Sequence, residues 1–181
     1  MNVRITKADE SRLSACHEVF LDSALYDHYF SQEGRLDKQL STAISRGELW
    51  IALTSQDEVA GCMWVEPDGF FGTFPYLALL GVKKSFRGMG IGHVLLETFI
   101  GVSRSLGYKK CSLLVSHFNP RAKNLYQSLG FQKVGCVPHC ILPGTQENIR
   151  EKDIKMKKKP GPLRAPGFFY SLGFSPLLLT K

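Results

Sequence analysis

The stretch that decides the fold is LLGVKKSFRGMGIG, residues 79–92. An apolar run typical of a strand leads into a short basic segment, followed by three alternating glycines and the start of a helical pattern. Glycines let the backbone approach a ligand without Cβ collisions, and neighbouring amides there can point into one cavity. A helix that begins at the same place adds the positive end of its dipole. We therefore expect the loop to bind an anion, and a pyrophosphate fits best.

The length and composition are those of one globular domain. The chain has 181 residues, of which 44% are apolar and 22% charged, an ordinary balance for a soluble protein. No window reaches the roughly 18 consecutive apolar residues of a membrane span. The first residues, MNVRITK, alternate like a strand and lack the apolar core of a signal peptide. The expected location is cytoplasmic.

The basic charge is confined to one end of the chain. Six of the 23 basic residues and none of the 16 acidic ones lie in residues 155–181, so residues 1–154 hold 17 basic and 16 acidic residues. A near-neutral body argues against a nucleic-acid-binding fold. We therefore expect a domain over residues 1–157 and a basic and apolar tail over residues 158–181. That tail is either a solubilising segment or a region that docks a partner or a membrane surface.

The cysteines do not predict a disulfide framework, because they are five in number and scattered. The run Cys136-Val137-Pro138-His139-Cys140 has some character of a metal site. A zinc site needs about four ligands, however, and the sequence has no second Cys/His pair with this spacing of three or four residues. We expect reduced cysteines and no metal.

Hydrophobic periodicity predicts strands alternating with helices along the whole body. The apolar run at residues 74–82 is expected at the centre of the sheet, with both faces covered. The pattern predicts a mixed α/β (α+β) fold, in which helices cover a single sheet. The predicted strands are 3–6, 49–54, 59–65, 74–82, 110–116, 131–137 and 150–156; the helices are 9–20, 36–47, 91–106 and 119–129; residues 67–69 and 140–148 are expected to be loops.

The glycine loop alone has rival interpretations. A P-loop needs Lys-Ser or Lys-Thr after the glycines, and neither is present. A dinucleotide fingerprint needs Gly-x-Gly-x-x-Gly and an acid about 20 residues on, whereas the sequence has Lys109 and Lys110 there. The glycines could also serve only close packing of a helix on a strand.

A second block makes the pattern specific. Arg87-x-x-Gly90-x-Gly92, followed after a strand by Asn119-x-x-Ala122-x-x-x-Tyr126-x-x-x-Gly130-Phe131, resembles the GNAT N-acetyltransferase superfamily. The resemblance spans residues 1–157 and implies a mostly antiparallel sheet of six to seven strands. This sheet splays at a β-bulge on the fourth strand and carries about four helices on its faces.

The resemblance also implies an acyl-CoA site. Backbone groups of residues 80–82 would pair with the pantetheine arm as an added strand does, and amides of residues 87–92 would cradle the pyrophosphate. Asn119 would bond the pantetheine or cap its helix, and Tyr126 would offer its hydroxyl to the departing thiolate rather than serve only as a core aromatic. The cofactor-binding residues expected are Leu80, Gly81, Val82, Arg87, Gly88, Met89, Gly90, Ile91, Gly92, Asn119 and Tyr126.

The implied reaction is direct attack of a neutral amine on the thioester of acetyl-CoA, with Tyr126 as general acid. A strand amide near Val82 can polarise the carbonyl. Many relatives use a carboxylate on the fourth strand as base, but residues 74–82 contain none. Glu66, His117 and ordered water remain as candidates. Without a base, the alternative is a non-catalytic acyl-CoA-binding module or sensor.

In this family the acceptor is chosen by segments that correspond here to residues 22–30 and 140–148. Acidic side chains could attract a cationic amine and aromatic ones could wall it in, or the segment could be ordinary solvated surface. A small polyamine-like amine, an antibiotic and a protein N-terminus or lysine all stay open, as does a homodimer. The residues concerned are Asp22, Asp27 and Glu33, with Tyr26, Tyr29 and Phe30.

Overall fold

The computed structural model describes residues 2–155, so the tail predicted at residues 158–181 lies outside the described residues. These residues form a seven-stranded sheet in the order β1-β2-β3-β4-β5-β7-β6, together with five α-helices. The strands are β1 (Arg4–Lys7), β2 (Leu49–Leu53), β3 (Val59–Phe70), β4 (Phe74–Val82), β5 (Lys110–Ser116), β6 (Gln132–Pro138) and β7 (Gln146–Asp153). The helices are α1 (Leu13–Phe20), α2 (Ala24–Tyr29), α3 (Arg35–Ser45), α4 (Ile91–Ser105) and α5 (Pro120–Ser128), with short 3-10 turns η1 (Glu10–Arg12) and η2 (Lys84–Phe86).

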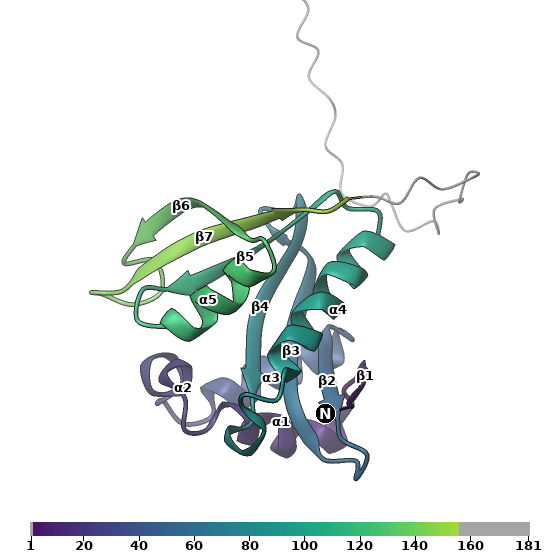
Figure 1. The fold of residues 1–181 in the computed structure, drawn as a ribbon. Coiled ribbons are helices and arrows are strands. Elements are labelled where there is room, and N and C mark those ends of the chain that lie inside the picture. The colour runs from purple at the N-terminus through teal and green to yellow at the C-terminus, as the bar shows by residue number, and fades with distance from the viewer. Residues whose placement is uncertain (1, 156–181) are drawn as a thin grey trace, which may run out of the picture.

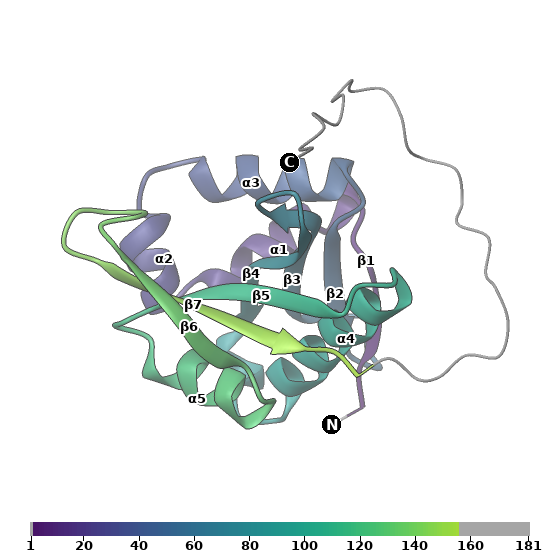
Figure 2. The same ribbon diagram turned by 90° about the horizontal axis from the view of Figure 1, so that it is seen from above.

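Helices cover both faces of the sheet, as predicted. Figure 2 shows α1, α2 and α3 on one side and α4 and α5 on the other. Each side has its own buried cluster: Phe20 and Leu40 belong to the first, and Leu95 and Phe99 to the second. The sheet is therefore the middle layer between two hydrophobic cores.

The sheet splays beside its central strand, β4. Every neighbouring pair of strands is antiparallel except β4 and β5, which are parallel and share only the register pairs Tyr76↔Ser112 and Leu77↔Leu113. On the other side of β4, Trp64 and Val65 are adjacent on β3 but pair with Leu79 and Leu77, so Ala78 is an extra residue in β4. Such a bulge bends a strand. Beyond it, β4 diverges from β5 (Figure 1), and the predicted bulge and splay are confirmed.

Three boundaries differ from the sequence-based expectation. The turn predicted at residues 67–69 is wrong, because β3 continues to Phe70 and the chain reverses at residues 71–73, where Gly72 has φ +69°. An irregular register between Glu66 and Phe70 accommodates Pro67, and Phe70 stacks on Phe74 across the hairpin with ring centroids 4.9 Å apart.

The other two differences concern α2 and β7. The segment at residues 22–30 contains a helix of six residues, capped by Ser23, whose hydroxyl accepts from the amide of Tyr26. A helix this short carries too little periodicity to be recognised in the sequence. β7 begins at Gln146, four residues before its predicted start, so part of the expected loop at 140–148 is strand.

Candidate active site

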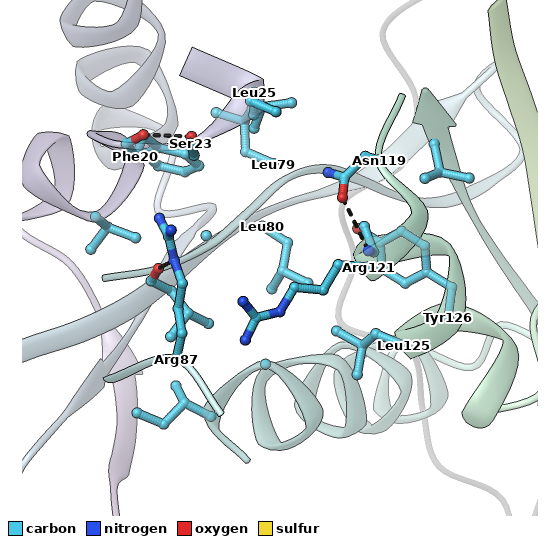
Figure 3. A pocket seen from close by; sticks show the side chains of 18 of the residues that line it. Phe20, Ser23, Leu25, Leu79, Leu80, Arg87, Asn119, Arg121, Leu125 and Tyr126 are labelled. Atoms are coloured by element: carbon cyan, nitrogen blue, oxygen red, sulfur yellow. Dashed lines mark hydrogen bonds between the residues drawn. The ribbon is translucent and has the colours of Figure 1, made fainter. Parts of the chain in front are cut away.

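A cavity of about 570 Å³ opens where β4 and β5 separate. Its walls come from the second half of β4, the loop and first turn after it, the end of β5, the start of α5, and the end of α1 with the start of α2. Figure 3 shows that side chains from these elements, far apart in the sequence, converge on one space. The splay of the sheet thus creates this hollow.

The wall formed by β4 is a strand edge without a partner strand. Leu80, Gly81 and Val82, which belong to the expected cofactor-binding set, line the cavity, and none of them pairs in register with a residue of β5. Gly81 has to be glycine here, because a Cβ at this position would lie 2.8 Å from Val19 Cγ1 and from Phe20 Cε1. The end of α1 therefore packs directly against the backbone of β4.

The glycine loop after β4 forms the next wall. Gly88 and Gly90 have φ of +83° and +82°, a left-handed conformation that favours glycine. Gly90 occupies the N-cap of α4, a helix of 15 residues whose first amides have no acceptor within the helix. Arg87, Gly88, Gly90, Ile91 and Gly92 all line the cavity.

Met89 is the one loop residue of the predicted set that lies outside the cavity wall, with 49% of its surface exposed. Its place between two left-handed glycines turns its side chain to the outside. Any contribution of Met89 to ligand binding would have to come from its main chain.

Arg87 uses its side chain to join two loops. Its Nε donates to the carbonyl of Val82 at 3.0 Å, and its two terminal nitrogens donate to the carbonyls of Asp22 at 3.0 Å and Leu21 at 3.4 Å. The side chain thereby ties the glycine loop to the segment between α1 and α2. Motif spacing predicted the position of Arg87 at the site but not this bridging role.

On the opposite side, α5 presents Asn119 and Tyr126. The Oδ1 of Asn119 accepts from the amide of Ala122 at 3.1 Å, which confirms the predicted N-cap. Tyr126 is 7% exposed, and burial raises the pKa of its hydroxyl well above the ordinary range. Both residues line the cavity, and in Figure 3 the ring of Tyr126 projects toward Asn119. Tyr126 therefore stays protonated at neutral pH.

Arg121 is a cavity residue that the sequence reasoning missed. It lies in the first turn of α5, four residues before Leu125, and both line the cavity. In Figure 3 its guanidinium extends into the space between Arg87 and Tyr126. The signal available in the sequence was this i, i+4 spacing, which places both side chains on one helix face.

The two predicted base candidates do not line the cavity. Glu66 pairs with Tyr76 on the β3–β4 ladder, and burial, with a smaller effect of Glu48, raises the pKa of its carboxyl. The Nδ1 of His117 accepts from the amide of Gln146 at 3.2 Å, in the turn after β5. Their roles in the reaction stay predictions.

The acidic and aromatic residues expected around the acceptor are not brought together. Of this set only Asp22 lines the cavity. Tyr29 and Phe30 are buried in the core, and Tyr26 packs against His17 with ring centroids 5.8 Å apart. Asp27 and Glu33 lie outside the cavity wall.

Behind the end of β5 lies a buried polar cluster that the sequence did not indicate. Ser116 Oγ donates to Glu147 Oε2 at 2.9 Å, Tyr29 Oη donates to Glu147 Oε1, and the two hydroxyl oxygens are 2.8 Å apart. Glu147 is 1% exposed and Ser116 is 7% exposed, and Ser116 lines the cavity.

Metal-binding clusters and membrane-spanning helices are both absent from the described part of the chain. Residues 2–155 contain no group of three or more His, Cys, Asp and Glu side chains placed to hold a metal ion. Within the same residues, every helix is too short or too polar to cross a membrane.

Comparison with known families shows to which family the chain belongs. A sequence profile of the Acetyltransferase (GNAT) family matches residues 13–131, from α1 to the residue before β6. The chain belongs to the GNAT family. The matched region contains the glycine loop, Asn119 and Tyr126, so this GNAT chain carries both blocks of the predicted motif.

Curated relatives of this GNAT chain include several named N-acetyltransferases. Probable N-acetyltransferase 14 of Xenopus tropicalis is 27% identical over 93 residues, covering 51% of this chain and 45% of the relative. N-acetyltransferase 8B of Homo sapiens is 33% identical over 94 residues (43% and 41%). The peptidyl-lysine N-acetyltransferase YjaB of Salmonella typhimurium is 28% identical over 100 residues (55% and 61%). The chain spans about half the length of the curated relatives it matches.

Solved structures confirm the GNAT fold. Ard1 of Thermoplasma volcanium superimposes with a TM-score of 0.73 at 15% identity, covering 86% of this chain and 99% of that one. The ribosomal-protein-S18-alanine N-acetyltransferase of Escherichia coli gives 0.68 at 19% identity (90% and 100%). A chain of the NatC complex bound to Gag peptide and CoA gives 0.70 at 17% identity (86% and 100%).

Proposed function

We propose that this GNAT protein is an acetyl-CoA-dependent N-acyltransferase that acetylates a primary amine. The observation that carries the proposal is the single cavity that brings together the glycine loop, the free edge of β4 and Tyr126. These three features suit the three parts of an acyl-CoA: the pyrophosphate, the two amides of the pantetheine and the thioester.

The residues present fit such a ligand. The amides of residues 87–92 and the start of α4 would hold the pyrophosphate, because a Cβ added at Gly88 or Gly90 would meet no atom within 4 Å, which leaves the main chain accessible. The guanidinium of Arg121, which extends into the cavity in Figure 3, would offer a further cation to the phosphates. Residues 80–82 pair with β3 on one side, and their free edge toward β5 would bond the pantetheine amides as a neighbouring strand does.

Chemistry would take place between β4 and Tyr126. Acetyl-CoA supplies a thioester carbonyl, which an amide of β4 near Val82 would polarise. Tyr126 would donate its proton to the leaving sulfur, a role that suits a hydroxyl held protonated by burial. The acceptor amine would enter the cavity from the side lined by Leu77–Leu79 and the end of β5.

The proposal is tested by thiol release from acetyl-CoA with a panel of amines. The names of relatives suggest a lysine-containing peptide and a peptide with a free N-terminal alanine; spermidine and an aminoglycoside complete the panel. We expect turnover with at least one of them. Titration calorimetry of acetyl-CoA runs in parallel, because binding without any turnover would instead support a non-catalytic acyl-CoA sensor.

A further inference from the structure

The buried cluster of Tyr29, Ser116 and Glu147 has an unusual proton count. Three oxygen–oxygen contacts link the two hydroxyls and the carboxylate in a ring. When Glu147 is ionised, the ring contains only the two hydroxyl protons for three contacts. When Glu147 is protonated it contains three, one for each contact. The ring therefore has a place for one more proton.

The electrostatic surroundings of Glu147 also lack a cation. Within residues 2–155 its carboxylate forms no ion pair, although it is 1% exposed. The groups that face it are hydroxyls: Tyr29 from α2, Ser116 from β5 and, at longer range, Tyr76 from β4. Burial and the hydrogen bond to Glu147 raise the pKa of Tyr29 to about 12, so Tyr29 keeps its proton and the two hydroxyl protons stay in the ring. Among the described residues, the carboxylate of Glu147 is therefore held by hydroxyl donors alone.

The cluster reaches the cavity through one residue, Ser116. Ser116 lines the cavity at the end of β5, three residues beyond the last β4–β5 pair, and its hydroxyl bonds Glu147 behind the wall. Neither Glu66 nor His117 lines the cavity in this way. A proton released inside the cavity can therefore reach Glu147 by one hydroxyl exchange.

We propose that Ser116 and Glu147 are the proton exit of the acyl transfer, and that the acceptor enters as a primary ammonium beside Ser116. This inference rests on the proposed function. Ser116 Oγ takes a proton from the ammonium while its own proton passes to Glu147 Oε2. Glu147 acts through Ser116 and positions it; it does not touch the substrate.

The step balances. The freed nitrogen lone pair forms the N–C bond, and the C–S bond breaks with its electron pair on sulfur. Tyr126 gives its proton to that sulfur and regains one from the attacked nitrogen. Glu147 later releases its proton to solvent. The sum is an ammonium and acetyl-CoA giving an amide, CoA thiol and one proton.

The pH dependence of Glu147→Gln tests the proposal. With the best amine of the panel, wild-type kcat/KM should be flat between about pH 7 and pH 9. The variant should be about 100-fold slower at pH 7. Its kcat/KM should then rise about tenfold per pH unit, because only the fraction of amine already neutral in solution can react. Ser116→Ala should behave in the same way and replaces Glu147→Gln if that variant does not fold.

Glu151→Gln is the matched control. It makes the same change on the same strand, at a carboxylate that pairs with Lys110 at 2.7 Å outside the cavity, and its pH profile should follow the wild type. If kcat/KM of Glu147→Gln depends on pH in the same way as that of the wild type, whatever its absolute value, the proton exit is overturned and Glu147 has only a structural role. Wild-type binding of acetyl-CoA without turnover of any amine overturns the proposed function, and the proton exit with it.

Discussion

Tyr126 owes its properties to its place on a short helix that packs against the second core. Its ring contacts Phe131 with centroids 6.2 Å apart, while the residue also borders the cavity. The apolar surroundings penalise the phenolate, so the hydroxyl is a poor acid in the ground state. In the proposed reaction it would become an effective acid only when a thiolate develops next to it.

Tyr126→Phe should therefore lower kcat about 100-fold and leave the Kd for acetyl-CoA within about twofold of the wild type. The matched control is Tyr108→Phe, which removes a hydroxyl bonded to Asp68 outside the cavity. Stopped-flow thiol release and calorimetry measure the two quantities. An equal loss of kcat in both variants would mean that Tyr126 has no special role.

At this scale the sequence predicts residues that lie within a motif and misses those joined only by folding. Asn119 and Tyr126 could be predicted from the sequence because both belong to one helical motif, at the N-cap and inside α5. Ser116 and Glu147 are 31 residues apart and face each other only through the β5–β7 register. That register depends on where β7 begins, and the sequence placed its start four residues late.

The loop between β4 and α4 depends on backbone conformation more than on side chains. Gly90→Ala introduces a Cβ at φ +82°, where no neighbouring atom obstructs it, so the cost is backbone strain of about 1–2 kcal/mol. We expect the loop to relax away from its cradle and the Kd for acetyl-CoA to rise about tenfold. Calorimetry of the folded variant measures this.

Gly101→Ala provides the contrast within the same element. Gly101 lies inside α4, and a Cβ added there would meet no atom within 4 Å. Alanine at this position should stabilise the protein by about 0.5–1 kcal/mol and leave acetyl-CoA binding unchanged. If both variants weakened binding equally, the left-handed conformation at Gly90 would not be the cause.

Most elements were predictable because their periodicity is long enough to read. β4 and β5 have the predicted bounds, and α4 begins at Ile91, at the predicted position directly after Gly90 of the glycine loop. The β3–β4 turn was not, because Pro67 and Gly69 normally end a strand. Here the aromatic stack of Phe70 on Phe74 continues the hairpin past them.

On the scale of the whole molecule, the sheet consists of two parts joined at β4 and β5 by two register pairs. A ligand that bonds the free edge of β4 would add a connection between them. Acetyl-CoA at about 100 times its Kd should stabilise the fold by about 2.7 kcal/mol. Hydrogen exchange should show new protection concentrated in residues 78–82. Stabilisation without protection there would place the ligand elsewhere.

The stability of the protein at alkaline pH should depend on Cys111, which is buried in the core between the sheet and helices α4 and α5. Burial raises the pKa of the Cys111 thiol from an ordinary 9.0 to about 12. Between these values the unfolded chain has lost the proton and the folded chain keeps it. The free energy of unfolding should therefore fall as pH rises from about 9 toward 12, by up to about 1.4 kcal/mol per pH unit. Urea unfolding of Cys111→Ala should show a shallower fall; an identical slope would contradict the assignment.

The contact of α1 with Gly81 has a consequence for protein engineering. Most of the cavity wall comes from residues 77–93 and 114–126, whereas the wall at residues 19–25 belongs to a separate stretch near the start of the chain. The two sides meet where Val19 and Phe20 pack against the Gly81 backbone and where Arg87 donates to the carbonyls of Leu21 and Asp22. A chimera that takes its first two helices from another GNAT protein, and retains these contacts, would combine a foreign wall with an unaltered glycine loop and β4 edge.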